Sequence, residues 1–449
     1  MKKVDTAIIG AGISGLAAGL VLKENNQDFI LLEARDRVGG RMYTVEAGPT
    51  YLDLGAQWIG PTQEAMYGLV KQAGLDYFAT YNSGKNILGY QQQLTAYSGT
   101  IPKLSWRNLW SLARAMYTLE WRAKRVPLTR PWTAKKSKHW DQITLADFVA
   151  KQVRSPAAKA VLEAGLETVF ACDLEKISLL QALFYFRSGR NLDTLIRIPR
   201  GAQQHRVKGG IQQLATWMAD RLQSELQLST PVLKISQGTD GLVIMTGNTT
   251  YLAKKLIIAV PPVQAKKMVE GLSLSADKTK WLNGFFMGQV IKCYAVYSRP
   301  FWREAGWSGQ AVLDHHYPVQ TLFDNSPAEG HPGVMMAFSI GRRADQFTAL
   351  PLAERRNKFV KILARLYGAE AFTPLHYQEM IWSQETYSGG CYTGLVSPGT
   401  MTSVTQPYNH PDGDIFWAGT EASAIWNGYM EGAILAGRQA ARQVIKSLT

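Results

Sequence analysis

The chain has 449 residues, 46% of them hydrophobic and 10% aromatic, and its formal net charge is +14. This length is too great for one hydrophobic core and predicts two domains, while the apolar content excludes a disordered chain. The basic residues are scattered apart from short clusters such as 135–138, and no nucleic-acid-binding motif accompanies them. We therefore expect no nucleic-acid partner, and at most a weak peripheral contact with an anionic membrane.

Cysteine usage and hydropathy indicate the compartment. Three cysteines, Cys172, Cys293 and Cys391, cannot form a complete disulfide framework, which favours a reducing, cytoplasmic environment. The basic start followed by apolar residues is similar to a signal peptide, but glycines interrupt the apolar run, and a buried strand explains it better. No run of about 18 apolar residues occurs, so no integral membrane anchor is expected.

The first element is a nucleotide-binding motif. An apolar run at 4–9 leads into Gly-x-Gly-x-x-Gly at 10–15 and then into a helical segment at 16–22, and a second strand at 29–32 ends at Glu33. In such a unit the first glycine makes a tight turn, the second lets pyrophosphate contact the backbone, and the third packs helix against strand. The helix N-terminus faces the phosphates and the acid accepts ribose hydroxyls. The sequence therefore predicts a Rossmann-like, dinucleotide-binding domain.

The next segments continue this domain and then leave it. A turn at 34–41 holds three arginines and a glycine pair, and such a turn can place a guanidinium against pyrophosphate. A helix is expected from 61 to 74. From 77 to 204 the pattern is helical and aromatic. We expect most of its tryptophans to be packing anchors: Trp106, Trp110, Trp121, Trp132 and Trp140.

The second half of the chain alternates between the same two domains. A helix is expected at 211–222, strands at 242–246 and 256–260, a strand-rich section beyond 285, a strand at 415–418 and a final helix at 430–446. The predicted fold class is α/β with mixed α+β character, in which a second domain of mixed sheet plus helices is inserted twice. The expected boundaries are 1–76, 205–284 and 385–449 for the nucleotide domain, and 77–204 and 285–384 for the substrate domain.

Two positions in this half suggest chemistry. Lys292 lies in a predicted strand at 288–297 and shares a face with apolar residues, so its stem can cover apolar surface while its amine reaches water. The segment 387–393 places Cys391 after two glycines and between tyrosines. A lone cysteine is more often a small buried hydrophobe, and only the N-terminal nucleotide motif makes another role attractive.

Taken in order, these motifs resemble the flavin-dependent monoamine oxidases over nearly the whole chain. The stretches that carry the resemblance are 10–15 with Glu33, 37–41, 53–63, 290–293, 300–303, 387–393 and 418–433. The last two stretches, 387–393 and 418–433, are the most specific. Mitochondrial members continue into a hydrophobic anchor, and this sequence shows none.

The resemblance implies FAD as the cofactor, with the Cys391 sulfur bonded to its 8α carbon after attack by the thiolate. A free buried thiol is the alternative, because some relatives bind FAD noncovalently. The residues expected to bind FAD are Gly10, Gly12, Ser14, Gly15, Glu33, Ala34, Arg35, Gly40, Arg41, Gln57, Trp58, Val232, Cys391, Gly419, Thr420, Glu421 and Met430.

The resemblance also implies three catalytic residues. Tyr392 and Tyr429 would flank the substrate nitrogen as an aromatic cage. Lys292 would lie next to flavin N5 through one water, with a pKa lowered by burial, and would help O2 accept electrons. The expected walls of the substrate pocket are Thr168, Val169, Ile196 and Gln203, although the sequence around them diverges from the family.

The predicted activity is oxidation of a primary, or small secondary or tertiary, amine with O2 and water to an aldehyde, ammonia or an amine, and hydrogen peroxide. A homodimer is expected, and no metal. A polyamine (putrescine-type) oxidase would need carboxylates for a distal ammonium, and an L-amino acid oxidase would need an arginine clamp, for which Arg197 or Arg200 are candidates. A non-catalytic flavoprotein acting as scaffold or redox sensor is a remote alternative.

Overall fold

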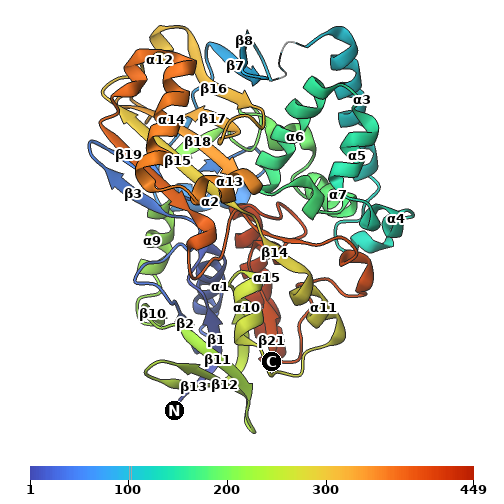
Figure 1. Cartoon of the computed structure of the whole chain (residues 1–449). Coiled ribbons are helices and arrows are strands. Elements are labelled where there is room, and N and C mark those ends of the chain that lie inside the picture. Colours follow the sequence, from blue (N-terminus) through green and yellow to red (C-terminus); the bar gives the residue numbers. More distant parts are fainter. Residues whose placement is uncertain (101, 103, 449) are drawn as a thin grey trace.

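The computed structural model describes every residue except 101, 103 and 449, so the last residue of the expected nucleotide domain lies outside the described residues. A seven-stranded sheet forms the lower part of the molecule in Figure 1, with both termini close to it. Its central strand β1 (Lys2–Ile9) runs parallel to β2 (Phe29–Leu32) and to β13 (Thr250–Ile258). The other strands are β10 (Leu226–Gln227), β11 (Val232–Gln237), β12 (Leu242–Thr246) and β21 (Ile415–Trp417).

Apolar helices pack on this sheet. α1 (Ile13–Glu24) and α15 (Met430–Leu448) lie side by side, and a Cβ on Gly437 would fall only 2.0 Å from the Ser14 carbonyl oxygen. This glycine therefore allows the close approach of the first and last helices. The remaining helices of this part are α2 (Glu64–Gln72), α9 (Gln212–Asp220), α10 (Pro262–Met268) and α11 (Ala276–Gly284).

A second seven-stranded sheet lies at the upper left of Figure 1, where α12, α13 and α14 cover it. Two of its strands, β15 (Val290–Tyr297) and β18 (Gly333–Ile340), are buried along their whole length and pair antiparallel. The other strands are β7 (Lys85–Tyr90), β8 (Gln93–Tyr97), β16 (Trp307–Leu313), β17 (Thr321–Asp324) and β19 (His376–Ile381), and the helices are α12 (Phe301–Glu304), α13 (Arg342–Thr348) and α14 (Leu352–Tyr367).

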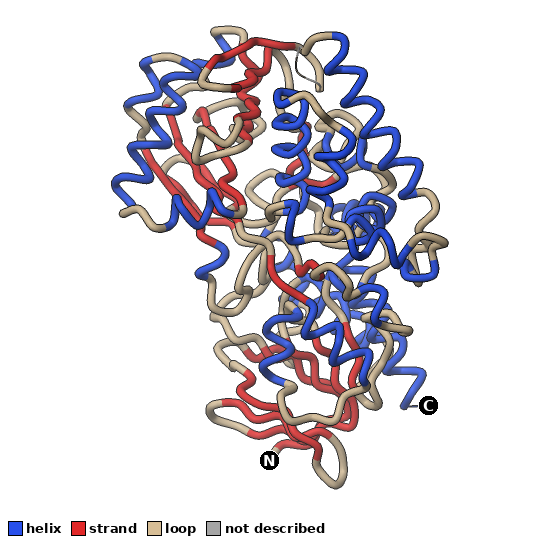
Figure 2. The backbone as a smooth tube through the Cα atoms, turned by 45° about the vertical axis from the view of Figure 1, so that its right-hand side comes forward, coloured by secondary structure: helices blue, strands red, loops and turns tan. Residues whose placement is uncertain are grey.

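A group of helices stands beside this sheet, at the upper right of Figures 1 and 2. They are α3 (Trp106–Ala123), α4 (Ser137–Gln142), α5 (Leu145–Gln152), α6 (Pro156–Phe170), α7 (Leu179–Ser188) and α8 (Leu192–Ile196). Short strands join the parts: β3 (Thr44–Ala47) with β4 (Thr50–Asp53), β9 (His205–Val207) with β5 (Trp58–Ile59) and β6 (Tyr77–Ala79), and β14 (Phe285–Met287) with β20 (Gly394–Val396).

The mixed α/β fold class predicted from the sequence is confirmed, but two local expectations are wrong. Residues 77–97 form strands before the helices begin, because β6 pairs with β9 while β7 and β8 complete the second sheet, in which β7 pairs with β16. Three tryptophans expected as packing anchors, Trp106, Trp110 and Trp121, are exposed. The domain boundaries stay a prediction, which the membership of the two large sheets supports.

Candidate active site

A cavity of about 600 Å³ runs from the N-terminal glycine motif to the second sheet and the helices beside it. This volume lies within the range of small-molecule and cofactor sites. Its walls include residues from both ends of the chain, from Ile9 to Ala433. The fold therefore brings the separate sequence motifs to one place.

The glycines of the motif have different surroundings. A Cβ on Gly12 would meet no atom within 4 Å, so its backbone faces open cavity. A Cβ on Gly15 would lie 1.9 Å from the Gly10 carbonyl oxygen, and Gly15 does not line the cavity. The third glycine thus packs helix against strand, as expected, while the second leaves room at the start of α1, which has no side-chain cap.

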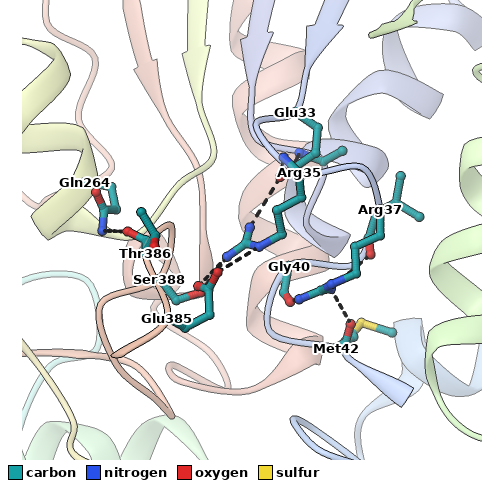
Figure 3. Close-up of polar contacts among 11 residues, drawn as sticks. Glu33, Arg35, Arg37, Gly40, Met42, Gln264, Glu385, Thr386 and Ser388 are labelled. Carbon is teal, nitrogen blue, oxygen red and sulfur yellow. Dashed lines mark hydrogen bonds and ion pairs between the residues drawn. The ribbon is translucent and has the colours of Figure 1, made fainter. Parts of the chain in front are cut away.

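The acid at the end of β2 is held in place by the backbone. The Ala11 amide donates to Glu33 Oε2 at 2.7 Å, and the Arg35 amide donates to Oε1 at 3.0 Å. Arg35 extends from Glu33 to the loop before Cys391, where it contacts Glu385 Oε1 at 3.1 Å and the Ser388 hydroxyl at 3.1 Å (Figure 3). This arginine ties the cysteine loop to the nucleotide motif.

The other two arginines of the turn are also engaged. Arg37 lies 3.9 Å from the ring of Tyr43 and donates to the carbonyl of Gly40 (Figure 3). Arg41 makes a bidentate contact with Glu421, at 2.8 and 3.3 Å, and also donates to the carbonyl of Tyr392. A guanidinium that faces pyrophosphate therefore stays a prediction.

Glu421 is a buried anion behind the cavity wall. Burial would raise its pKa, but the charge and hydrogen bonds of Arg41 outweigh burial, and the pKa is lowered. Glu421 also accepts the Gly394 amide at 2.9 Å and the Thr393 hydroxyl at 3.1 Å. Its carboxylate thus fixes the segment that follows Cys391.

Lys292 lies in β15 and lines the cavity, although only 3% of its surface is exposed. Its amine donates to the carbonyls of Asp53 and Gly55, at 2.6 and 2.8 Å, and to Gln57 Oε1 at 2.6 Å. Burial lowers the pKa of Lys292 to about 7. Three protein acceptors match the three hydrogens of an ammonium, so the water-bridged contact expected for this residue requires one of them to give way.

Cys391 is buried and lines the cavity. Burial raises the pKa of its thiol to about 12, although Arg41 and Lys292 act in the opposite direction. The thiol is therefore neutral near pH 7 in this environment. The thiolate assumed from the sequence has to be generated during reaction.

Both cage tyrosines line the cavity. Tyr392 lies edge-on to Phe338 with ring centroids 5.7 Å apart, and Tyr429 lies 6.1 Å from the ring of Tyr185. Besides burial, each of the tyrosines Tyr185 and Tyr429 contributes to the shifted pKa of the other, which is consistent with their neighbouring rings. Within its own segment Tyr185 is not distinctive, because it lies in an apolar helix where an aromatic residue is typical of a core position.

Room for this third tyrosine comes from a glycine. A Cβ on Gly428, whose φ is +86°, would lie 2.5 Å from the Tyr185 hydroxyl. Gly428 belongs to a stretch on which the resemblance rests. Its position before Tyr429 is the one sequence signal that points to Tyr185.

The expected pocket walls, Thr168, Val169, Ile196 and Gln203, all line the cavity. Gln203 donates to the Leu195 carbonyl at 2.9 Å, which leaves its buried Oε1 without a partner. Among the described wall residues Glu33 is the one carboxylate, and it lies at the nucleotide end. Of the arginine candidates, Arg197 lines the cavity and pairs with Asp193 at 2.6 Å, whereas Arg200 does not line it.

Of the residues expected to bind FAD, to act in catalysis or to line the substrate pocket, only Gly15 and Glu421 lie outside the cavity wall. The site fits a flavin dinucleotide: the open backbone at Gly12 offers N–H groups for phosphates and Glu33 offers a carboxylate for a ribose. Cys391, Lys292 and the tyrosines surround the other end.

Comparison with known proteins supports the flavin-binding site described above. A profile of the flavin containing amine oxidoreductases matches residues 13–445. The chain belongs to this family. It is 34% identical over 441 residues to the protein named as flavin-containing monoamine oxidase AofH in Mycobacterium tuberculosis, covering 98% of this chain and 96% of AofH.

Other members of the family are similar over similar lengths. Human flavin-containing amine oxidase B is 31% identical, covering all of this chain and 87% of the human protein. Two solved structures, a putrescine oxidase bound to putrescine and the cyclohexylamine oxidase of Brevibacterium oxydans IH-35A, have TM-scores of 0.92 and 0.94 with 27% and 26% identity. Each alignment covers 99% of both chains. As a member of this family, the protein is an oxidoreductase that acts on small-molecule amines with a flavin.

No helix among the described residues is both long and apolar enough to span a bilayer.

Proposed function

We propose that the protein is an FAD-dependent monoamine oxidase. The observation that carries this proposal is the single cavity, which joins the glycine motif at 10–15 to Lys292, Cys391, Tyr392 and Tyr429. Gly12 and Glu33 would hold the dinucleotide end of FAD, and Cys391 would face its flavin end. When bound, FAD supplies a two-electron acceptor, which no side chain in this cavity offers, and passes the electrons to O2.

The overall reaction balances with water and O2. The α-carbon of the amine loses a hydrogen with two electrons, and the nitrogen of a primary or secondary amine also loses a proton, so the substrate becomes an imine. A tertiary amine becomes an iminium ion instead and releases its proton on hydrolysis. Water converts the imine to an aldehyde and releases ammonia, or an amine from a secondary or tertiary substrate. O2 takes up the two electrons with two protons and becomes hydrogen peroxide.

The protein positions the reactants and excludes water. The rings of Tyr392 and Tyr429 orient the neutral amine, and the apolar walls keep it dry. The amine of Lys292, held by Asp53, Gly55 and Gln57, places a positive charge where O2 gains electrons. No side chain is required as a general base.

The cavity favours a monoamine with an apolar body. A diamine needs a carboxylate for its distal ammonium, and Glu33, the one carboxylate among the described wall residues, is held by the Ala11 and Arg35 amides. An amino acid needs a free guanidinium, and Arg197 pairs with Asp193. The likeness to a cyclohexylamine oxidase supports this preference, but the likeness to a putrescine oxidase is equally strong, so the preference rests on the cavity wall.

Peroxide release tests the substrate class. We expect turnover of benzylamine and of aliphatic monoamines, with kcat/KM at least tenfold lower for putrescine and for L-amino acids. Faster turnover of putrescine or an amino acid would replace the monoamine assignment. Yellow protein that is inactive with every amine would favour a scaffold or redox sensor instead.

Covalent attachment has a separate test. Acid-precipitated protein should keep its yellow colour, and Cys391→Ala should release the flavin into the supernatant. Cys172→Ala is the matched control, since this buried cysteine does not line the cavity. Free flavin from the unmodified protein would show that Cys391 only packs against the cofactor.

The homodimer and the cytoplasmic location expected from the sequence stay predictions. Analytical ultracentrifugation and cell fractionation test them.

A further inference from the structure

Helix α3 presents exposed aromatic residues that the proposed function does not use. Trp106, Trp110, Tyr117 and Trp121 are 73%, 63%, 70% and 47% exposed. At about 100° per residue, their spacing places all four within roughly 60° of arc on one side of the helix. We call these four residues the aromatic stripe. The opposite side of α3, which includes Leu119, is buried.

Arginines accompany the aromatic stripe. Three Trp–Arg pairs repeat along the helix, with guanidinium-to-ring distances of 5.4 Å for Arg107 and Trp106, 5.6 Å for Arg114 and Trp110, and 3.2 Å for Arg125 and Trp121. An indole suits the boundary between headgroups and acyl chains, and a guanidinium forms bidentate contacts with phosphate. Each pair therefore offers both kinds of contact that a phospholipid surface accepts.

Carboxylates do not balance this charge. Residues 104–154, which include α3, α4 and α5, carry eleven Lys and Arg against three Asp and Glu, a net charge of +8 out of the total of +14. The acids are engaged elsewhere: Glu120 accepts the Leu192 amide at the start of α8, Asp141 is buried, and Asp147 caps α5. The net positive charge of the chain is thus concentrated in residues 104–154, although basic residues occur throughout the sequence.

We propose that α3 docks the protein on the surface of an anionic lipid bilayer. The aromatic stripe enters the headgroup region and the neighbouring arginines contact lipid phosphates. An amphipathic helix with aromatic residues beside arginines lies in the plane of such an interface, and an anionic leaflet attracts each basic residue. The charge complementarity of this face is what selects the lipid surface.

Two other occupants fit less well. In a two-fold dimer through this face, the same arginines would oppose one another, with no carboxylate on the aromatic stripe to pair with them. A single-stranded nucleic acid needs a basic groove that follows its backbone. The aromatic stripe instead lies on the outer side of α3, at the edge of the molecule (Figure 1).

Vesicle sedimentation with the flavin-loaded full chain tests the proposal. Vesicles of equal parts phosphatidylcholine and phosphatidylglycerol are compared with phosphatidylcholine alone at low ionic strength. One variant combines Trp106→Ser, Trp110→Ser and Trp121→Ser, and a second combines Arg107→Gln, Arg114→Gln and Arg125→Gln. Leu112 and Met116, on the inner side of α3, line the cavity and are left unchanged.

The chain offers matched controls far from α3. Leu352, Phe372 and Leu375 are 55%, 55% and 63% exposed, and their change to Ser removes a similar apolar area. Replacement of Arg356, Lys358 and Lys361 on α14 by Gln removes the same charge as the arginine variant. Flavin content and activity in solution report whether each variant is folded.

We expect binding only to the anionic vesicles, with a salt-dependent affinity. The arginine variant should bind about a hundredfold more weakly, which corresponds to roughly a fivefold loss per basic residue, and the tryptophan variant at least tenfold more weakly, while both controls stay within twofold. Absence of binding to anionic vesicles, or wild-type affinity in the α3 variants, would overturn the proposal. So would a lipid-free dimer that the tryptophan variant dissociates, or an arginine-dependent complex with a homopolymer RNA in place of vesicle binding.

Discussion

The two ends of the cavity are formed by different kinds of chemical groups. At the nucleotide end, backbone turns and buried charges fix the shape: Glu33 accepts two amides, and Arg41 pairs with Glu421. At the amine end, the walls are side chains from helices and strands, such as Val169 and Phe338. A wall of backbone and ion pairs tolerates little change, whereas a wall of apolar side chains can be altered without loss of the fold. Substitutions at the two ends should therefore fail in different ways.

The largest effect is expected at the glycines, where two similar changes should have opposite consequences for the fold. Gly15→Ala drives a Cβ into the Gly10 carbonyl, and we expect a loss of about 3 kcal/mol or more in the free energy of unfolding. In Gly12→Val the added side chain meets open space in the cofactor-free protein, so the variant should fold. The valine side chain should, however, fill space that the cofactor needs. Thermal unfolding and the flavin absorbance of each purified variant check this. Normal flavin content in Gly12→Val would place the cofactor elsewhere.

The buried ion pair behind the cavity comes next. Arg41→Met leaves Glu421 charged and buried, and we expect a loss of about 3 kcal/mol in the free energy of unfolding at neutral pH. The pKa of Glu421 is lowered in the folded state, so the stability that it contributes is present above its unfolded pKa. That contribution is lost as pH falls through the lowered value.

Chemical denaturation of wild type and Arg41→Met between pH 7 and acid pH measures this difference. The wild type should lose more of its stability on acidification than the variant does. Lys254→Met, which breaks the exposed pair with Asp5, is the control and should have no measurable effect. Equal losses in the two variants would mean that burial adds nothing to the Arg41 pair.

The two ends of the cavity also differ in how much of their structure could be predicted from the sequence. At the nucleotide end the backbone contacts of Glu33 lie within or next to a local motif, so the strand, the turn and Glu33 could be assigned from spacing alone. The pairing of Arg41 with Glu421 joins residues 380 positions apart, and no local pattern encodes it. Sequence spacing reveals contacts within a turn and not the partners that folding brings to it.

At the amine end the resemblance identified Tyr392 and Tyr429, and the structure adds Tyr185. A tyrosine in the apolar helix α7 is typical of a core position, and only its place in the cavity wall beside Gly428 and Tyr429 distinguishes it. The exposed tryptophans of α3 were misjudged for the related reason that an aromatic residue at helical spacing usually marks a buried face. Which side of an amphipathic helix is inside depends on its neighbours.

Lys292 lies in the cavity wall with Cys391 and the two cage tyrosines. Lys292→Met should slow reoxidation of the reduced protein by O2 about a hundredfold, because it removes a preorganised charge. Because burial lowers the pKa of Lys292 to about 7, the wild-type reoxidation rate should fall as pH rises through that value, and the variant should lack this dependence. Stopped-flow absorbance of the flavin measures both.

Lys278→Met is the matched control for this variant. Lys278 is also buried and donates to the carbonyls of Tyr408 and His410, but it does not line the cavity. The Lys278→Met variant should be less stable than the wild type but should keep the wild-type oxygen reaction. An oxygen reaction unchanged in Lys292→Met would remove this residue from the mechanism.

The stability of the wild type should also rise with pH between about 7 and 10.5, since Lys292 in the unfolded chain binds a proton there that Lys292 in the folded protein has released.

The smallest effect is expected at the hydroxyl of Tyr185. Tyr185→Phe keeps the ring beside Tyr429 and removes only the hydroxyl, so kcat should fall by about threefold with unchanged flavin content. A double-mutant cycle with Tyr429→Phe should give a coupling of about 1 kcal/mol, because the two side chains are neighbours. If Tyr185→Phe alone lowered kcat a hundredfold, the hydroxyl would take part in the chemistry, and the amine end could no longer be regarded as a wall that only orients the substrate. A fall of a few fold with that coupling would instead assign Tyr185 to holding the ring of Tyr429 in place.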